Sequence, residues 1–166
     1  METHGELSHG EERSSIEALL VFRVRSYRFA VHVQTVEKVV SILEISALPG
    51  APDAVAGVFN FHGTVVPVLD LNLRIDGQVA KPSLDAQLLI VQTPTRRLAI
   101  LADEVLDIIA IPGDKIVSRT ALVAGAGLVS GVAAAPDGLI FIQDANTLLM
   151  QADEVRLASL LSKARA

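Results

Sequence analysis

The chain contains one sequence pattern twice, and this repeat limits its possible folds more than any other feature. Residues 19–40, LLVFRVRSYRFAVHVQTVEKVV, align without gaps with residues 88–109, LLIVQTPTRRLAILADEVLDII, at an offset of 69. Five of these 22 positions are identical, and most positions that are apolar in the first copy are apolar in the second. At an offset of 74, Gly57, Asp70 and Asn72 coincide with Gly131, Asp144 and Asn146. The pattern predicts one β-unit that is used twice.

Each copy consists of short runs of apolar and β-branched residues that alternate with turn residues. Turn signals recur about every eight to twelve positions, which is typical of small barrels or sandwiches and not of a parallel sheet. A barrel of ~60 residues buries so little of its surface that its stability alone would be marginal. We therefore expect a mainly β protein made of two small barrels that share an apolar interface.

Helical segments are expected at two places. Val33, Val36, Val39 and Val40 follow helical spacing and predict one or two helical turns. Residues 152–166 predict a C-terminal helix that packs across the body through an apolar stripe of Val155, Leu157, Ala158, Leu160, Leu161 and Ala164. Residues 1–15 are polar, acidic and rich in Gly and Ser, so we expect a disordered tail.

A hairpin is predicted in the segment GVFNFHGTVVPVLDL, residues 57–71. With Gly63 and Thr64 as a two-residue turn, His62 pairs with Val65 and Asn60 with Pro67. One face then carries Phe59, Phe61, Val66 and Val68 and points to the core, while the other carries Asn60, His62, Val65 and Pro67. Because proline cannot donate to a ladder, its strand should lie near an edge, be bulged, or pair only on its carbonyl side. The second face is suited to docking a protein partner.

The composition excludes several classes of function. The chain has no cysteine, a formal net charge of −5 and only 4% aromatic residues, so thiolate sites, a nucleic-acid surface and base-stacking platforms are not expected. No apolar run is long enough to span a bilayer, and the first residues lack a secretory signal, which favours a cytoplasmic location without membrane insertion. We expect no cofactor.

Catalytic and metal-binding sites are not expected either. The histidines at positions 4, 9, 32 and 62 lack ligand spacing, and no nucleophile motif accompanies His62. Three interpretations of His62 stay open: a partner-facing residue, a solvated strand end, or a catalytic or metal-binding residue. Asp103 and Glu104 are interpreted as caps of a helical turn.

Taken along residues 18–150, these segments resemble the CheW-like chemotaxis coupling proteins. The most specific stretch is the predicted hairpin, where the family pattern Gly-Val-x-Asn-Leu-Arg-Gly, a β-branched run with Pro, and Asp-Leu is matched by Gly57, Val58, Asn60, Phe61, His62, Gly63, Pro67, Asp70 and Leu71. The resemblance implies two five-stranded barrels within residues 16–151, formed by intertwined halves of about 16–75 and 85–150. It also implies a non-enzymatic adaptor.

Such an adaptor would join the cytoplasmic tip of a chemoreceptor to the regulatory domain of a CheA-type histidine kinase in a signalling array. By position, the receptor-facing residues would be Val33, Val36, Gly57, Asn60 and His62, and the kinase-facing residues would be Lys38 and Val39. His62 stands where the family often has Arg, and Lys38 where it often has Glu, so the partners can differ and the output can be gliding or pilus motility. The first alternative is a divergent competitor or accessory protein that binds only one of the two partners. The second, which the sequence favours less, is a small-molecule-binding β-barrel.

Overall fold

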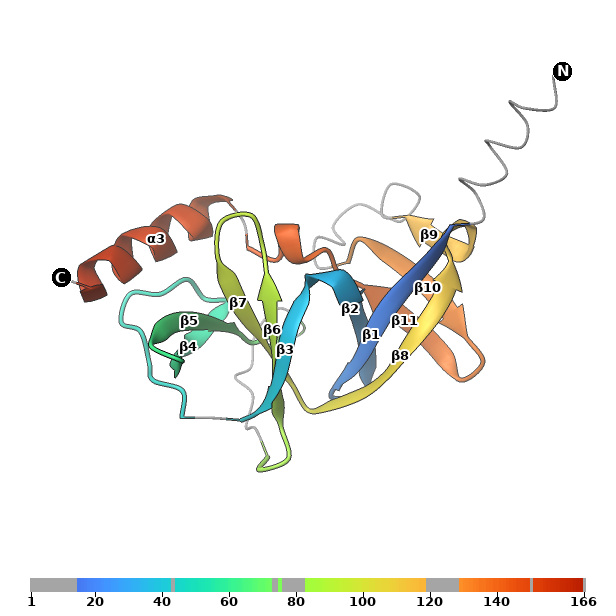
Figure 1. The fold of residues 1–166 in the computed structure, drawn as a ribbon, viewed down its shortest axis with the longest axis horizontal. Coiled ribbons are helices and arrows are strands. Elements are labelled where there is room, and N and C mark those ends of the chain that lie inside the picture. The colour runs from blue at the N-terminus through green and yellow to red at the C-terminus, as the bar shows by residue number, and fades with distance from the viewer. Residues whose placement is uncertain are drawn as a thin grey trace, which may run out of the picture.

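The computed structural model describes residues 15–42, 44–72, 75, 83–118, 129–149 and 151–165. Two antiparallel-rich sheets lie side by side along the long axis of the molecule (Figure 1). Apart from Ser15, the predicted N-terminal tail lies outside the described residues.

Six strands form the first sheet, called sheet A, in the order β8-β1-β2-β11-β10-β9. Their bounds are β1 Ile16–Val24, β2 Tyr27–His32, β8 Glu104–Pro112, β9 Ile116–Ser118, β10 Gly131–Ala135 and β11 Gly138–Ile142. Five strands form sheet B in the order β3-β6-β7-β5-β4. Their bounds are β3 Val36–Ser41, β4 Val55–Phe61, β5 Thr64–Leu69, β6 Gln87–Gln92 and β7 Arg97–Ala102. Among the described residues, 3-10 turns occur at η1 Val33–Thr35, η2 Gly113–Lys115 and η4 Ala145–Thr147, and helix α3 spans Gln151–Arg165.

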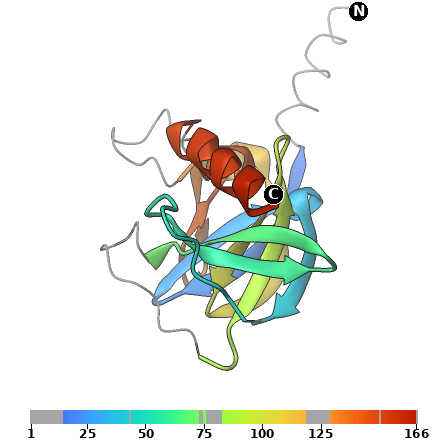
Figure 2. The ribbon, with the colours of Figure 1, turned by 90° about the vertical axis from the view of Figure 1, so that its left-hand side faces the viewer.

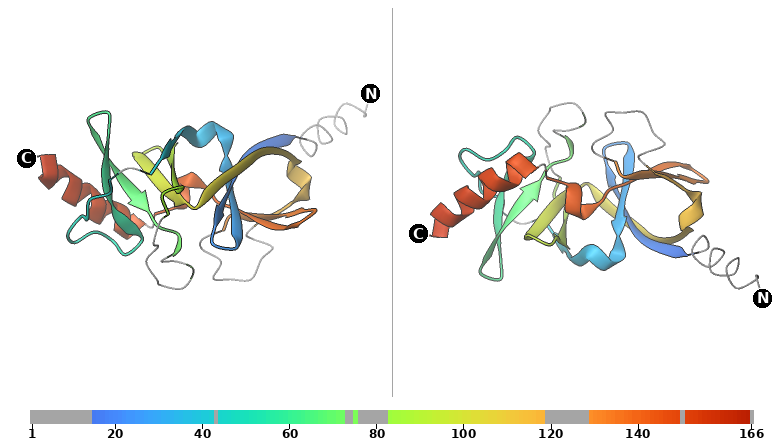
Figure 3. Two further views of the ribbon diagram at one scale, coloured as in Figure 1. Left: turned by 90° about the horizontal axis from the view of Figure 1, so that it is seen from below. Right: turned by 90° about the horizontal axis from the view of Figure 1, so that it is seen from above.

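Both sheets curl toward a closed barrel (Figure 3). In each sheet, the chain leaves the strand at one edge and then pairs with a strand at the opposite edge. In sheet A, β8 leads through η2 into β9, which pairs with β10. In sheet B, the chain after β3 reaches Ser46, which forms an isolated bridge with Val58 of β4. Since β9 is a short continuation of β8, each sheet has five principal strands, and the prediction of two small β-barrels is confirmed.

Strand registers confirm the internal duplication. Val40 of β3 lies opposite Leu88 of β6, and their counterparts at an offset of 69, Ile109 of β8 and Leu19 of β1, also lie opposite each other. The two parallel pairings, β5 with β7 and β11 with β2, are related in the same way. In each case the partners come from different copies of the repeat. The copies therefore exchange strands, and each sheet contains strands from both; the bounds of the two halves stay a prediction.

One prediction was wrong: residues 36–40 form a strand and not a helical turn, and only η1 is helical. The register of β3 against β6 shifts between Val36 and Lys38, which indicates a bulge at Glu37. This extra residue places Val36 and Val39 on the same face of the strand. Residues on one face are therefore three positions apart here, instead of two as in a regular strand, and this spacing resembles that of a helix. Strand β8 shows the same shift opposite Val21 and Phe22.

Three apolar clusters stabilise the fold. The central cluster draws on both sheets, with Leu20, Phe22 and Phe29 from sheet A and Leu89 and Ile100 from sheet B, so the predicted shared interface is confirmed. A second cluster fills the interior of sheet B and a third the interior of sheet A.

Helix α3 lies beside the β4–β5 hairpin of sheet B (Figure 2). Its buried contacts come from Leu157 and Leu161, four residues apart, while Val155 is 66% exposed. The predicted stripe is therefore only partly correct. Glu154 forms an ion pair with Arg96, which precedes β7 and ties the first turn of the helix to the sheet.

Candidate partner-binding surfaces

The turn between β4 and β5 consists of His62 and Gly63, one residue earlier than predicted. Both have positive φ, 51° and 85°, which is the signature of a type I′ turn. Phe61 therefore pairs with Thr64, and Asn60 with Val65. A histidine tolerates the left-handed region better than most residues, which allows this turn in place of the predicted Gly-Thr turn.

The predicted core face of this hairpin is nevertheless correct, since Phe59, Phe61, Val66 and Val68 are all buried. The predicted outer face is only partly free. Val65 is 38% exposed, but Pro67 is buried beside helix α3. Parallel pairing of β5 with β7 begins at the residue after Pro67, so the missing amide hydrogen interrupts no ladder.

His62 and Asn60 lie together at the hairpin tip, and both are exposed. The His62 ring contacts the Phe61 ring in a tilted arrangement, with centroids 4.3 Å apart and an interplanar angle of 56°. The Asn60 side-chain oxygen accepts a hydrogen bond from the backbone amide of Gly63 at 2.7 Å. Asn60 thus holds the turn that presents His62, whatever partner the turn contacts.

Gly57 has a packing requirement of its own. It is buried, and a Cβ at this position would lie 2.4 Å from the carbonyl oxygen of Ser46 and 2.8 Å from a methyl group of Ile45. Its repeat counterpart Gly131 is similarly tight, with a methyl group of Ile116 at 2.9 Å. The glycine is explained by the close approach of the segment that closes sheet B, and contact with a partner stays a prediction.

The predicted residues of η1 and β3 divide between two faces. Val33, Val36 and Val39 are half-buried and pack against the central cluster. Lys38 is exposed, and it lies opposite Ile90, which belongs to the interior of sheet B. The proposed kinase-facing pair, Lys38 and Val39, therefore points to opposite sides of β3.

Sequence reasoning missed an exposed apolar stripe on β1 and β8. Ile16 is 62% and Ile108 is 58% exposed, and Ala18 and Ala110 lie opposite each other between them. Ile108 lies opposite Leu20, a member of the central cluster that also receives Val33 and Val36. The sequence does contain an indication of this stripe in residues 106–112, LDIIAIP, which carry apolar residues on both faces of a strand. Only one face is needed to fill a barrel interior, so the second apolar face indicates a further contact.

The structure does not bring all predicted residues into one patch. Strands β3 and β4 are the two ends of the order of sheet B, with β6, β7 and β5 between them. Figures 2 and 3 show the β4–β5 turn and the η1–β3 segment on the same side of the molecule. The candidate surface therefore has two parts: an apolar part formed by the β1–β8 stripe with Val33 and Val36, and the hairpin tip with Asn60 and His62.

Arg28 and Arg97 occupy equivalent positions of the repeat, and each forms an ion pair. Arg28 of β2 forms a two-pronged ion pair with Asp137 in the β10–β11 turn. The hydrogen bond from the guanidinium holds the pKa of the Asp137 carboxyl below its usual value, against an opposing effect of desolvation, and it raises the pKa of Arg28. In sheet B the repeat counterpart of Arg28, Arg97, pairs instead with Glu37 at 2.9 Å.

Asp103 has a structural partner and not the predicted helix-capping role, whereas Asp144 caps the 3-10 turn η4. The Asp103 carboxylate accepts a hydrogen bond from the backbone amide of Arg25 at 2.7 Å, where the β1–β2 turn meets the start of β8. Asp70 and Asp144 each accept a bond from the backbone amide two residues on, both at 2.9 Å. In the part of the chain that the structure describes, no three metal-ligating side chains gather. None of the helices described there could cross a membrane.

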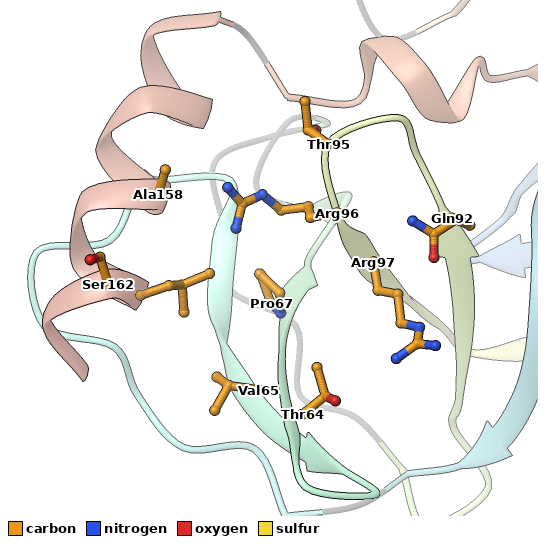
Figure 4. Close-up of a pocket in the computed structure, with 10 residues that line it drawn as sticks. Thr64, Val65, Pro67, Gln92, Thr95, Arg96, Arg97, Ala158 and Ser162 are labelled. Atoms are coloured by element: carbon orange, nitrogen blue, oxygen red, sulfur yellow. The ribbon is translucent and has the colours of Figure 1, made fainter. Parts of the chain in front are cut away.

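A polar pocket of about 550 Å³ separates α3 from β5 and β7 (Figure 4). Two arginines line it, but Arg96 pairs with Glu154 and Arg97 with Glu37. Since both cations are already matched by carboxylates, the pocket is better described as the seam under the helix than as an anion site.

Comparison with known proteins gives a consistent result. A model of the CheW-like domain matches residues 18–153. The chain is 30% identical over 93 residues to the chemotaxis protein CheW of Rhizobium meliloti, covering 56% of this chain and 60% of that protein. It is 28% identical over 102 residues to the probable chemotaxis protein CheW of Rhizobium etli, covering 61% and 65%. The chain thus spans less than two thirds of the length of these two relatives.

Longer matches are more distant. The chemotaxis protein CheW of Treponema pallidum is 22% identical over 148 residues, which covers 86% of this chain and 87% of that protein. The crystal structure of the scaffolding protein TtCheW from Thermoanaerobacter tengcongensis has a similar fold, with a TM-score of 0.73 and 23% identity. That match covers 82% of this chain and 89% of the other.

Proposed function

The chain belongs to the CheW-like domain family, and we propose that it is a non-enzymatic adaptor coupling a chemoreceptor to a CheA-type histidine kinase. Its partners would be the cytoplasmic tip of the receptor and the regulatory domain of the kinase. Its place would be the cytoplasmic side of a membrane-associated receptor array. The single observation that carries the proposal is the apolar stripe on β1 and β8, which leaves Ile16 and Ile108 exposed beside the central cluster.

The stripe suits a helical receptor tip. Contiguous exposed apolar side chains cost free energy in water and commonly mark an interaction site. An apolar helix face could cover Ile16 and Ile108 together with the half-buried Val33 and Val36. We assign Asn60 and His62 to the polar rim of the same receptor surface and Gly57 to its support.

For the kinase, we assign strand β3 with the exposed Lys38 and the half-buried Val39. β3 is the terminal strand of sheet B in the described order, and Lys38 is exposed on it. A charge at a rim position changes partner choice more than total affinity, so Lys38 would select a kinase with an acidic counterpart.

The proposal is tested by measuring binding of the receptor tip and of the kinase regulatory domain separately. Ile108→Asp is expected to weaken receptor binding roughly tenfold or more, because a charge replaces an apolar contact at the centre of the surface. Val155→Asp is the matched control, since Val155 is equally exposed but lies on α3. If the unaltered chain binds neither partner, the proposal is wrong.

A second candidate is a competitor that binds one partner without bridging both. His62 at the hairpin tip and Lys38 on β3 favour it, because neither side chain reproduces the Arg and Glu that the family often has there. Receptor tip, chain and kinase domain should form a ternary complex if the chain is an adaptor. A competitor would bind one component and displace the family member that normally bridges them.

A further inference from the structure

The interiors of the two barrels are filled differently at equivalent positions. In sheet B, Phe59 and Phe61 of β4 point inward and are 3% and 8% exposed. An offset of 74 places Ala133 and Ala135 of β10 at the same two positions. Strands β10 and β11 pair in the same register as β4 and β5 next to the turn, so the correspondence holds in the structure. Sheet A therefore lacks two benzyl groups that fill sheet B.

A cavity of about 550 Å³ occurs in sheet A beside the second of these positions, since Ala135 lines it whereas Ala133 is buried outside its lining. Its inward-facing apolar lining comes from β1, β8, β10 and β11: Val21, Ile109, Ile111, Ala135 and Ile140. The exposed Leu106, Ala134 and Pro136 complete the apolar lining. An apolar cavity of roughly 150 Å³ is enough to hold a benzene ring. Ligand sites of roughly 300–1,000 Å³ are typical and often occupy the mouths of β-barrels. The cavity has room for an aromatic ring with a short substituent.

The rim of the cavity favours a cation over an anion. Its charged lining residues are Arg28, Asp107 and Asp137, which sum to one negative charge. Arg28 is held by Asp137 in the two-pronged ion pair. One Asp107 carboxylate oxygen accepts a hydrogen bond from the amide of Ile108 at 2.8 Å, and the side chain is exposed at the rim. The repeat counterpart of Asp107 is Lys38, so the acidic rim is particular to sheet A.

From the apolar cavity and the net negative charge of its rim, we propose that the cavity of sheet A binds small aromatic amines. The ring occupies the volume that corresponds to Phe61 in sheet B, and the amine lies at the rim near Asp107. This site is separate from the β1–β8 stripe, because Ile109 and Ile111 point inward where Ile108 and Ala110 point outward. Its existence does not depend on the adaptor proposal.

The test uses the full chain with ¹³C-labelled isoleucine methyl groups and three probes of similar size: 2-phenylethylamine, 2-phenylethanol and phenylacetate. The amine is expected to shift the methyl signals of Ile109, Ile111 and Ile140 saturably, with a dissociation constant of about 1 mM or lower. Phenylacetate should bind roughly three- to tenfold more weakly, given one unfavourable charge near a solvated rim. Ile90 in the interior of sheet B serves as the internal reference.

Two variants complete the experiment. Ala135→Phe places in sheet A the residue that sheet B already has, and it should abolish the shifts. Asp107→Asn should keep the ring site and remove the preference for the amine. Leu139→Ala is the control, since Leu139 is 55% exposed and outside the cavity lining, and it should bind as the unaltered chain does.

Three results would overturn the proposal: no saturable shift with any probe, shifts that also appear at Ile90, or binding that survives in a folded Ala135→Phe variant. If Ala135→Phe does not fold, as judged by the methyl signals of sheet B, the Asp107→Asn comparison decides. An unchanged preference among the three probes would then refute the assigned role of the rim.

Discussion

Replacing Gly57 with alanine should destabilise the chain more than any other single methyl addition in the two hairpins. The added Cβ would lie 2.4 Å from the carbonyl oxygen of Ser46, whereas ordinary contacts begin near 3.4 Å. Ser46 would therefore have to retreat by about 1 Å. That oxygen and the amide of Ser46 form the two 2.8 Å hydrogen bonds with Val58 that close sheet B.

The magnitude follows from these contacts. Two weakened backbone hydrogen bonds cost about 1 kcal/mol each, and overpacking costs about 1–3 kcal/mol, so the expected loss is about 3–5 kcal/mol. At the counterpart Gly131, the nearest atom is a side-chain methyl of Ile116 at 2.9 Å, and the nearest backbone atom is at 3.2 Å. A side chain yields more readily than a backbone, so Gly131→Ala should cost only about 1 kcal/mol.

Urea unfolding followed by far-ultraviolet circular dichroism measures both free energies of unfolding. Partner binding, measured beside them at a temperature where Gly57→Ala is folded, separates packing from recognition. A loss below about 0.5 kcal/mol for Gly57→Ala, or a larger loss for Gly131→Ala, would refute the reasoning, because either result means that Ser46 does not approach β4 as the structure has it.

Three further predictions concern other parts of the molecule. Phe61→Ala should lower the free energy of unfolding by about 3–5 kcal/mol in urea unfolding, because it empties the interior of sheet B at a residue only 8% exposed; a loss near 1 kcal/mol would contradict the packing. Leu157→Ala should cost about 2–4 kcal/mol and expose α3 to limited proteolysis, since Leu157 is fully buried; Ser162→Ala on the same helix is the control, and equal cleavage of both would contradict the docking of α3. The hydrogen bond from Arg28 lowers the folded-state pKa of Asp137, so its stabilisation is present above the unfolded value of about 3.9 and is lost as the pH falls through the lower folded value. Nuclear magnetic resonance titration should therefore show a higher Asp137 pKa in Arg28→Met, and an unchanged pKa would contradict the ion pair.

Local features of the hairpin were predictable because they depend on neighbours in the chain. Alternation alone placed Phe59, Phe61, Val66 and Val68 inward, and all four are buried. The turn was predicted one residue late, because glycine was taken to be its first residue when it is its second, after a left-handed His62. The face assignment survived since it rests on each strand's own alternation and not on the pairing between strands.

The candidate site was less predictable than the fold. The position of His62 and Asn60 at the tip follows from the turn, but the stripe of Ile16 and Ile108 exists only because β8 pairs with β1, more than 80 residues away in the chain. The bulge in β3 spaces its apolar residues as in a helix, so the sequence pattern alone does not distinguish this strand from a helical turn. These features depend on contacts between distant segments.

By itself, the sequence determined that the chain is a duplicated β-unit, where most strands lie, and which residues of each strand are apolar. Only the tertiary structure decided that the copies exchange strands, that the second apolar face of β8 is partly left exposed, and that Ala135 borders a cavity in sheet A where its counterpart Phe61 fills the interior of sheet B. The physical reason is that side-chain alternation is a property of each strand, whereas backbone hydrogen bonds between strands are the same for any sequence. Which strands pair is therefore set by how well the apolar faces of the complete chain pack together.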